Sequence, residues 1–209
     1  MTVIEREYGI PRSTLSGWFK DIQLSEEQRT RLMKRSQDGW KKAREKAVVA
    51  HNTLKAERLY IAERDAADIV NRLQVTPEVL DVAFAMLYFG EGAKKNTTSI
   101  GNSNPLVLRF VLAVLYRNYA VKPSQIRCDL HLRADQDGDA MKQYWSEKLA
   151  LPLSQFKYIA YDKRSVGKPT YNHYKGVCVI TCNQIAIQRK LISLYNQFCT
   201  KISEEVLGA

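Results

Sequence analysis

Apolar residues recur along the chain in two spacings, and these spacings predict helices and strands. From residue 77 onward, segments with apolar residues every three or four positions alternate with short runs that are typical of strands, and residues 126–133 show the clearest alternation of apolar and polar residues. The predicted helices cover residues 77–91, 105–119, 137–149 and 183–202, and the predicted strands cover 97–102, 126–133, 156–162 and 174–181. This order predicts a mixed α+β domain.

The starts of these helices carry residues that cap free backbone N–H groups. Thr76 precedes Pro77 and Asn104 precedes Pro105, and proline is favoured at the first helical position. The region of Asp135 and Asp137 is expected to begin the third helix, and Asn183 the fourth.

The first 25 residues predict two short helices, 3–8 and 11–22, with Gly9 in the turn between them. In the second helix one face is apolar and is expected to be buried: Leu15, Trp18, Phe19 and Ile22. The other face is small, polar or basic: Arg12, Ser13, Thr14, Ser16, Gly17 and Lys20. This segment resembles the turn and recognition helix of a helix-turn-helix module, in which Arg12, Ser13, Thr14, Ser16 and Lys20 would contact DNA. An ordinary amphipathic helical hairpin is the alternative.

Residues 26–76 predict a long helical linker, opened by a capping box of Ser25 and Gln28. Gly39 is its weakest point and is expected to divide it into two helices. Eight lysines and arginines and two acidic residues lie between Arg29 and Lys46. This run is either a solvated helix face or a surface that follows a phosphate backbone. Further along, four apolar residues predict packing on the following domain: Leu54, Ile61, Ile69 and Leu73.

Charge gives the first indication of function. The 209 residues include 32 Lys and Arg against 22 Asp and Glu, a formal charge of +10, which favours a polyanionic partner. The longest apolar runs are far shorter than the ~20 residues of a membrane-spanning helix, and no signal peptide is evident, so we expect a soluble cytoplasmic protein without a membrane partner. The four cysteines lack the close pairing of zinc sites and are expected to be buried, reduced thiols.

Phe84 to Gly92 is the stretch with the most evident chemistry. An apolar helix ends there with Glu91 between Gly90 and Gly92, and Lys94 and Lys95 follow. An acid is disfavoured at a helix C-terminus, which carries partial negative charge, so Glu91 needs a positive partner. That partner is either a metal ion or a nearby cation such as Lys94, Lys95 or an arginine. Gly92 is expected to end the helix in a left-handed conformation.

These nine residues resemble the motif of the LAGLIDADG homing endonucleases, with Ala85, Leu87 and Gly92 identical and Glu91 at the final acidic position. Other segments are similar to a branch of bacterial and phage proteins with a single motif and an N-terminal helix-turn-helix. They are Asn102–Pro105, Tyr144–Ser146, Tyr174–Cys178 and Trp18–Ser25. Met86 and Phe89 depart from the motif, and the bulk of Met86 would loosen close helix packing.

The resemblance implies a LAGLIDADG-like saddle domain over residues 77–202, a tail over 203–209 and a homodimer. The helix interface between two copies would contain Ala83, Met86, Leu87 and Gly90. Glu91 would bind Mg²⁺, with Mn²⁺ as a substitute, and would help to activate water. The water would then hydrolyse phosphodiester bonds in double-stranded DNA. Lys94 and Lys95 would assist catalysis, and no small-molecule cofactor is implied. The host would be a bacterial or phage-infected cell.

The predicted strands offer a surface for DNA. Alternation over 126–133 places four apolar side chains on one face and Arg127, Asp129, His131 and Arg133 on the other. Residues 156–175 interleave tyrosines with basic residues expected to contact DNA: Lys157, Lys163, Arg164, Lys168 and Lys175. Gly167 to Pro169 are expected to form a flexible hairpin tip. Two alternatives remain open at this point: a DNA-binding regulator with an inactive LAGLIDADG-like domain, and an RNA-binding module.

Overall fold

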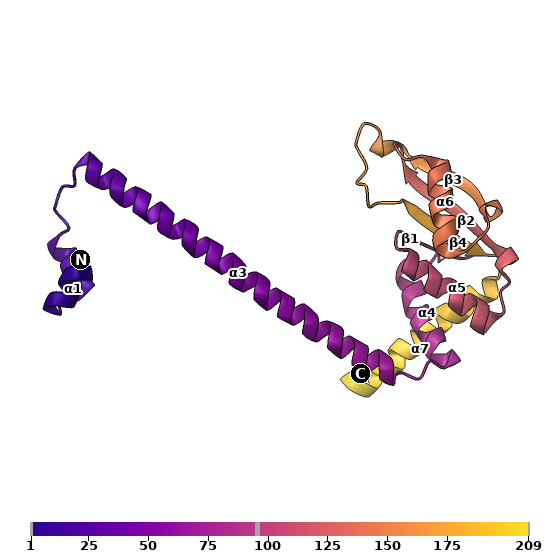
Figure 1. Cartoon of the computed structure of the whole chain (residues 1–209). Coiled ribbons are helices and arrows are strands. Elements are labelled where there is room, and N and C mark those ends of the chain that lie inside the picture. Colours follow the sequence, from indigo (N-terminus) through magenta and orange to yellow (C-terminus); the bar gives the residue numbers. More distant parts are fainter. Residues whose placement is uncertain (1, 95–96, 209) are drawn as a thin grey trace. The chain divides into compact units, whose positions relative to one another are not determined.

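The computed structural model describes residues 2–94 and 97–208, and the chain divides into two units between Leu73 and Gln74. The N-terminal unit contains α1 (Thr2–Tyr8), α2 (Arg12–Trp18) and α3 (Glu26–Arg72). The C-terminal unit contains the sheet and the remaining helices (Figure 1).

In the N-terminal unit, α1 and α2 are joined by a turn at Gly9, whose φ of 66° is in the left-handed region that glycine adopts readily. The second helix ends at Trp18, earlier than predicted. Of its expected buried face only Leu15 is buried, whereas Trp18 and Ile22 are exposed. The prediction of one continuous apolar face was therefore wrong, because α2 ends before Ile22 and the side chain of Trp18, its last residue, is exposed.

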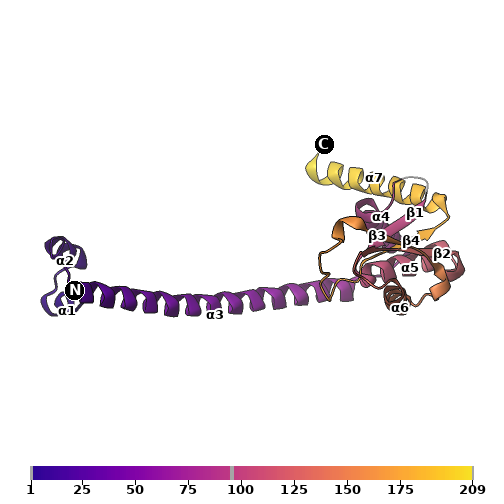
Figure 2. The same ribbon diagram turned by 90° about the horizontal axis from the view of Figure 1, so that it is seen from above.

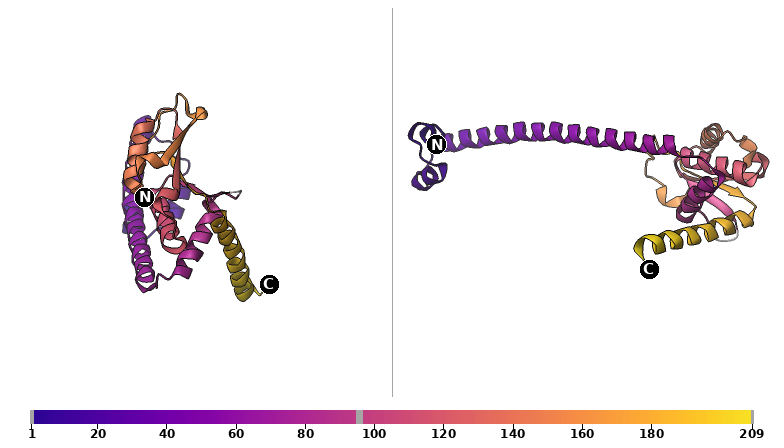
Figure 3. Two further views of the ribbon diagram at one scale, coloured as in Figure 1. Left: turned by 90° about the vertical axis from the view of Figure 1, so that its right-hand side faces the viewer. Right: turned by 90° about the horizontal axis from the view of Figure 1, so that it is seen from below.

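The helix α3 has 47 residues and begins at the predicted capping box. Figure 3 shows it as one unbroken helix. The expected break at Gly39 does not occur, since a single glycine costs a helix only about 1 kcal/mol. No residue of α3 is buried, so its apolar residues, Leu54 and Ile69 among them, stay exposed.

The C-terminal unit is a mixed α+β domain. Its helices are α4 (Pro77–Glu91), α5 (Pro105–Tyr119), α6 (Gly138–Leu149) and α7 (Ile185–Leu207). Its strands are β1 (Thr98–Asn102), β2 (Ile126–Arg133), β3 (Phe156–Asp162) and β4 (Val177–Cys182), and short 3₁₀ turns η1 (Pro123–Gln125), η2 (Leu153–Gln155) and η3 (Lys163–Ser165) precede or follow strands. All eight predicted elements are present.

The boundaries also agree closely. Thr76, Asn104 and Asp137 cap their helices with side-chain hydrogen bonds, as predicted. Asn183 does not, because the residue before α7 is Gln184, which makes no side-chain cap. The helix α7 continues to Leu207 through residues expected to form a frayed tail, and its last turns project from the rest of the unit (Figure 2).

The strand order in the sheet is β1-β4-β2-β3. Strand β4 pairs antiparallel with both β1 and β2, whereas β2 and β3 are parallel and connected through α6. Because β2 lies between β3 and β4, the segment that joins β3 to β4 is not a hairpin. It crosses the end of β2 instead, which corrects the predicted hairpin tip at Gly167 to Pro169.

One core lies between the helices and one face of the sheet. Its largest fully buried side chains include Trp145 of α6, Tyr88 and Phe84 of α4, and Leu130 and Leu132 of β2. Cys128, Cys178 and Cys182 are buried and all four cysteines are free, as expected, although Cys199 is only half-buried. The other face of the sheet carries exposed and half-buried side chains.

Candidate nucleic-acid interface and Glu91

The helix α4 has a buried face and an exposed one. Phe84, Ala85 and Tyr88 are buried against the core. Of the residues expected at a helix interface, Ala83, Met86 and Gly90 are exposed and Leu87 is half-buried against the core. The space beside Gly90 is open, with no atom of the chain within 4 Å of the point where a Cβ would lie. The exposed stripe is therefore open at Gly90, whereas the sulfur of Met86 lies 4.0 Å from that of Cys199 on α7.

Glu91 is the last residue of α4, and its side chain is exposed. The segment after it is held by Tyr88, whose single hydroxyl proton can be donated to the carbonyl oxygen of Ala93 at 2.7 Å or to that of Thr97 at 3.1 Å. Burial raises the pKa of Tyr88, so it remains a neutral donor. The backbone N–H of Ala93 also donates to Ser99 on β1. Glu91 thus projects from a fixed helix end.

Gly92 ends the helix for a different reason from the one predicted. Its φ is −84°, so no left-handed conformation is present. A Cβ at this position would lie 2.5 Å from the carbonyl oxygen of Tyr88 and 2.6 Å from its ring. Glycine is needed here because the chain passes so close to the Tyr88 ring.

Lys94 is directed to the helix end. Its ammonium group donates to the carbonyl oxygen of Tyr88 at 2.9 Å and to that of Phe89, and it lies 4.8 Å from the centre of the Phe89 ring. A cation there offsets the negative end of α4. None of the ion pairs among the described residues includes Glu91. Lys95 lies outside the described residues, and catalytic roles for both lysines stay predictions.

The donors for a metal ion are few in one copy of the chain. Within residues 2–94 and 97–208, no three Asp, Glu, His or Cys side chains are grouped so that they could hold a metal ion. Mg²⁺ commonly takes only one or two protein carboxylates and completes its shell with water and substrate phosphates. Glu91 therefore fits such an ion only as one of several ligands, with the others supplied from outside this chain.

The open face of the sheet carries the four polar residues predicted on β2. Arg127 and Asp129 form a two-pronged ion pair with N–O distances of 3.1 and 3.0 Å. His131 is exposed, and Arg133 is half-buried at the end of the strand. The alternation of buried and exposed residues along β2 confirms this division of the two faces.

The connection between β3 and β4, residues 163–176, carries most of the other basic residues. Lys163 and Arg164 lie in η3, Lys168 lies in the loop, and Lys175 directly precedes β4, whereas Lys157 lies on β3 where its register with β2 is irregular. Of these five residues only Lys175 is partly buried.

The connection is anchored rather than free. Thr170 donates from its backbone N–H to Asp135 at 2.7 Å and from its hydroxyl at 2.5 Å, and these bonds lower the pKa of Asp135. Ser165 accepts from the Ala134 N–H, and the Trp145 indole donates to the carbonyl oxygen of Lys175 at 2.9 Å. The basic loop is therefore held across the end of β2.

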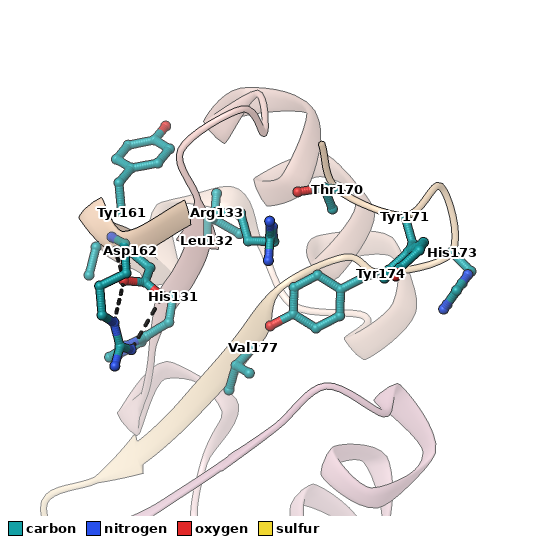
Figure 4. Close-up of a pocket in the computed structure, with 12 residues that line it drawn as sticks. His131, Leu132, Arg133, Tyr161, Asp162, Thr170, Tyr171, His173, Tyr174 and Val177 are labelled. Carbon is teal, nitrogen blue, oxygen red and sulfur yellow. Dashed lines mark hydrogen bonds and ion pairs between the residues drawn. The ribbon is translucent and has the colours of Figure 1, made fainter. Parts of the chain in front are cut away.

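Between this connection and the sheet lies a cavity of about 550 Å³ that the sequence did not predict (Figure 4). Its walls come from the ends of β2 and β3, the start of β4 and the loop. Polar and aromatic side chains line it: His131, Arg133, Asp162, Arg164, Tyr171 and Tyr174. Several of these residues were predicted from the sequence as DNA contacts. The sequence did not predict that they line one cavity, because they come together only where the loop crosses the end of β2.

In the N-terminal unit, the five residues predicted to contact DNA lie on α2 or directly after it, and Arg12, Ser13, Thr14 and Ser16 are exposed, as is Lys20. Arg12 forms an ion pair with Glu5 of α1 at 3.7 Å. The predicted DNA-contacting surface of α2 is therefore exposed within the N-terminal unit.

Two of the other matched segments contain residues that shape the chain locally. The side chain of Asn102 accepts from the Asn104 N–H at 2.8 Å, which shapes the turn into α5. Gly176 has a φ of 74°, and a Cβ there would lie 2.8 Å from the His131 carbonyl oxygen. These residues are therefore explained by turns and close packing.

Comparisons with protein-family models, curated proteins and solved structures gave no match. None of the described helices combines the length and the apolar character needed to span a membrane.

Proposed function

We propose that the chain is a metal-dependent DNA endonuclease that acts as a homodimer. The observation that carries this proposal is the combination on α4 of an exposed small-residue stripe with an exposed carboxylate, Glu91, at its fixed end. The resemblance of Phe84 to Gly92 to the LAGLIDADG motif points to the same arrangement. Two copies that pair along α4 would bring two Glu91 side chains together.

The exposed face of α4 supports pairing through its shape. Ala83 and Gly90 have small or no side chains, and such residues allow two helix backbones to approach closely. Met86 is 44% exposed and lies on the same face, and its flexible side chain can adapt to a partner surface. Burial of such a stripe against a second copy removes apolar surface from water, which favours association of the two copies.

Each copy would contribute Glu91 as a carboxylate ligand for Mg²⁺ or Mn²⁺, and phosphate oxygens and water would supply the other ligands. A bound metal ion would stabilise the charge that develops on the phosphate and on the leaving 3′ oxygen. The chain itself would fix the position of the Glu91 carboxylate, because Tyr88 and Gly92 hold the end of α4 in place.

The open sheet face and the basic connection support DNA as the substrate. Side chains of Arg, His and Asp on a sheet surface can read base edges in the major groove, and the exposed lysines beside them can bind phosphates. The charge of +10 favours the approach of any polyanion, so it supports binding without specifying a sequence.

The direct test is Glu91→Gln, which keeps the size of the side chain and removes its charge. We expect the variant to bind DNA as tightly as the wild type and to have lost metal-dependent cleavage. Binding is measured by gel retardation and cleavage by the appearance of new ends on the same DNA. Full cleavage by Glu91→Gln would exclude the proposed role of Glu91.

One observation favours a second candidate, a DNA-binding regulator that does not cut. Glu91 is the only carboxylate that the structure places at the end of α4, and no metal-binding group of three side chains exists among the described residues. A regulator would protect a discrete DNA segment and leave both strands intact in every divalent metal.

A further inference from the structure

The cavity at the end of the sheet is lined by aromatic side chains as well as by basic ones. A duplex is bound through exposed groups that contact its grooves and phosphates. The cavity instead lies beneath the connection between β3 and β4, and aromatic rings surround much of it. In Figure 4 the Tyr174 hydroxyl points into the hollow, and Tyr171 and His173 lie together at its edge.

The rings at this edge are arranged for stacking. Tyr171 and His173 are nearly parallel, with an angle of 16° between their planes and 5.7 Å between their centres. Both residues are exposed, so one face of this pair is free to receive another flat ring. Proteins bind unpaired bases on exposed aromatic rings of this type.

The polar groups of the cavity suit the rest of a nucleotide. Arg133 donates one hydrogen bond, to the carbonyl oxygen of Lys168 at 3.0 Å, and its buried Nε has no partner among the described residues. Its guanidinium therefore keeps donors for a phosphate. Asp162 is held by Arg164 at 2.9 and 3.3 Å, which neutralises its charge while leaving carboxylate lone pairs for an amino group.

We propose that this cavity binds one unstacked nucleotide of the nucleic acid, with its base on the Tyr171 and His173 pair and its phosphate at Arg133. The proposal rests on the proposed function in that it assumes a nucleic-acid partner. It adds that the partner is bound in part as a single, unpaired nucleotide.

The probe for this site is 2-aminopurine deoxyribonucleoside 5′-monophosphate, which carries a phosphate, an exocyclic amino group and a fluorescent base that is quenched on stacking. We expect saturable quenching by the full-length wild-type protein at low salt. A single-stranded oligonucleotide should displace the probe more effectively than a duplex of the same length.

The variants separate stacking from general damage. Tyr171→Leu should weaken probe binding at least about fivefold, the low end for loss of one stacked base, whereas Tyr171→Phe should retain it. Tyr158→Leu is the matched control, because Tyr158 is an exposed tyrosine on the same sheet that does not line the cavity. It should bind the probe as the wild type does. Tyr171 is 77% exposed, so its replacement should leave the fold intact.

The outcomes distinguish the two proposals. Duplex binding without saturable probe binding would overturn the nucleotide site and leave the proposed function standing. Probe binding that needs Tyr171, without any binding of duplex DNA, would support the site and overturn the proposed function. Equal losses in Tyr171→Leu and Tyr158→Leu would also overturn the site.

Discussion

Gly90 and Gly92 lie two residues apart at the end of α4, and the structure predicts opposite effects of alanine at the two positions. Gly92→Ala places a Cβ within 2.6 Å of Tyr88, which forces a shift that costs about 1–3 kcal/mol and moves Glu91. Gly90→Ala meets no atom within 4 Å and should stabilise the helix by up to about 1 kcal/mol.

Urea unfolding of the two variants measures both effects. Equal changes in the free energy of unfolding would contradict the close approach of Gly92 to Tyr88.

The sequence identified Glu91 because an acid between two glycines at the end of an apolar helix is unusual. It could not identify what Lys94 does, because the position of the Lys94 ammonium group depends on the path of the chain after the helix. The same path explains why the expected conformation of Gly92 was wrong. Residue types and their spacing therefore predicted which residues could belong to a functional site. They did not predict the contacts that those residues make.

Three helices of the C-terminal unit are joined at Asp81 of α4. Lys190 of α7 forms an ion pair with it at 2.6 Å, and Asn118 of α5 donates to it at 2.9 Å. Burial alone would raise the pKa of Asp81, but the hydrogen bonds from Lys190 and Asn118 outweigh it and hold this pKa below its usual range.

A lowered pKa in the folded protein means that the Asp81 carboxylate stabilises the fold above its unfolded pKa, about 3.9. This stabilisation is lost as the pH falls through the folded pKa. Asp81→Asn should therefore be less stable than the wild type at neutral pH, and the difference should shrink below about pH 4. Urea unfolding over this range is the measurement, and a difference that does not change with pH would contradict the assignment.

At the scale of elements, the sequence predicted the four helices and four strands after residue 76, and the buried residues of β2 and β4 alternate along the strand. The same sequence pattern did not predict the order of the strands in the sheet. The alternation in β2 and β4 is the same whether β3 pairs with β4 or with β2, so the crossing of β2 by residues 163–176 was not predictable. The cavity was missed for the same reason, since it exists only because of that crossing.

At the scale of the whole molecule, the basic run of α3 is exposed, which is compatible with both interpretations of its charge. We predict that it binds phosphates. Lys41→Gln combined with Lys42→Gln should lower the salt dependence of DNA binding by about 0.9 in log–log slope for each phosphate that is no longer neutralised. Affinity measured over a range of salt concentrations gives this slope. An unchanged slope would show that this part of α3 is only a solvated face.

The most direct test of whether the protein cuts DNA through Glu91 is an assay of plasmid cleavage. The substrate is a supercoiled plasmid that carries the gene's own flanking DNA. The wild type and Glu91→Gln are compared in Mg²⁺, in Mn²⁺ and with a chelator. We predict linear plasmid only with the wild type and only with metal. Plasmid that is retarded by the wild type and remains uncut in both metals would contradict a nuclease and favour the regulator.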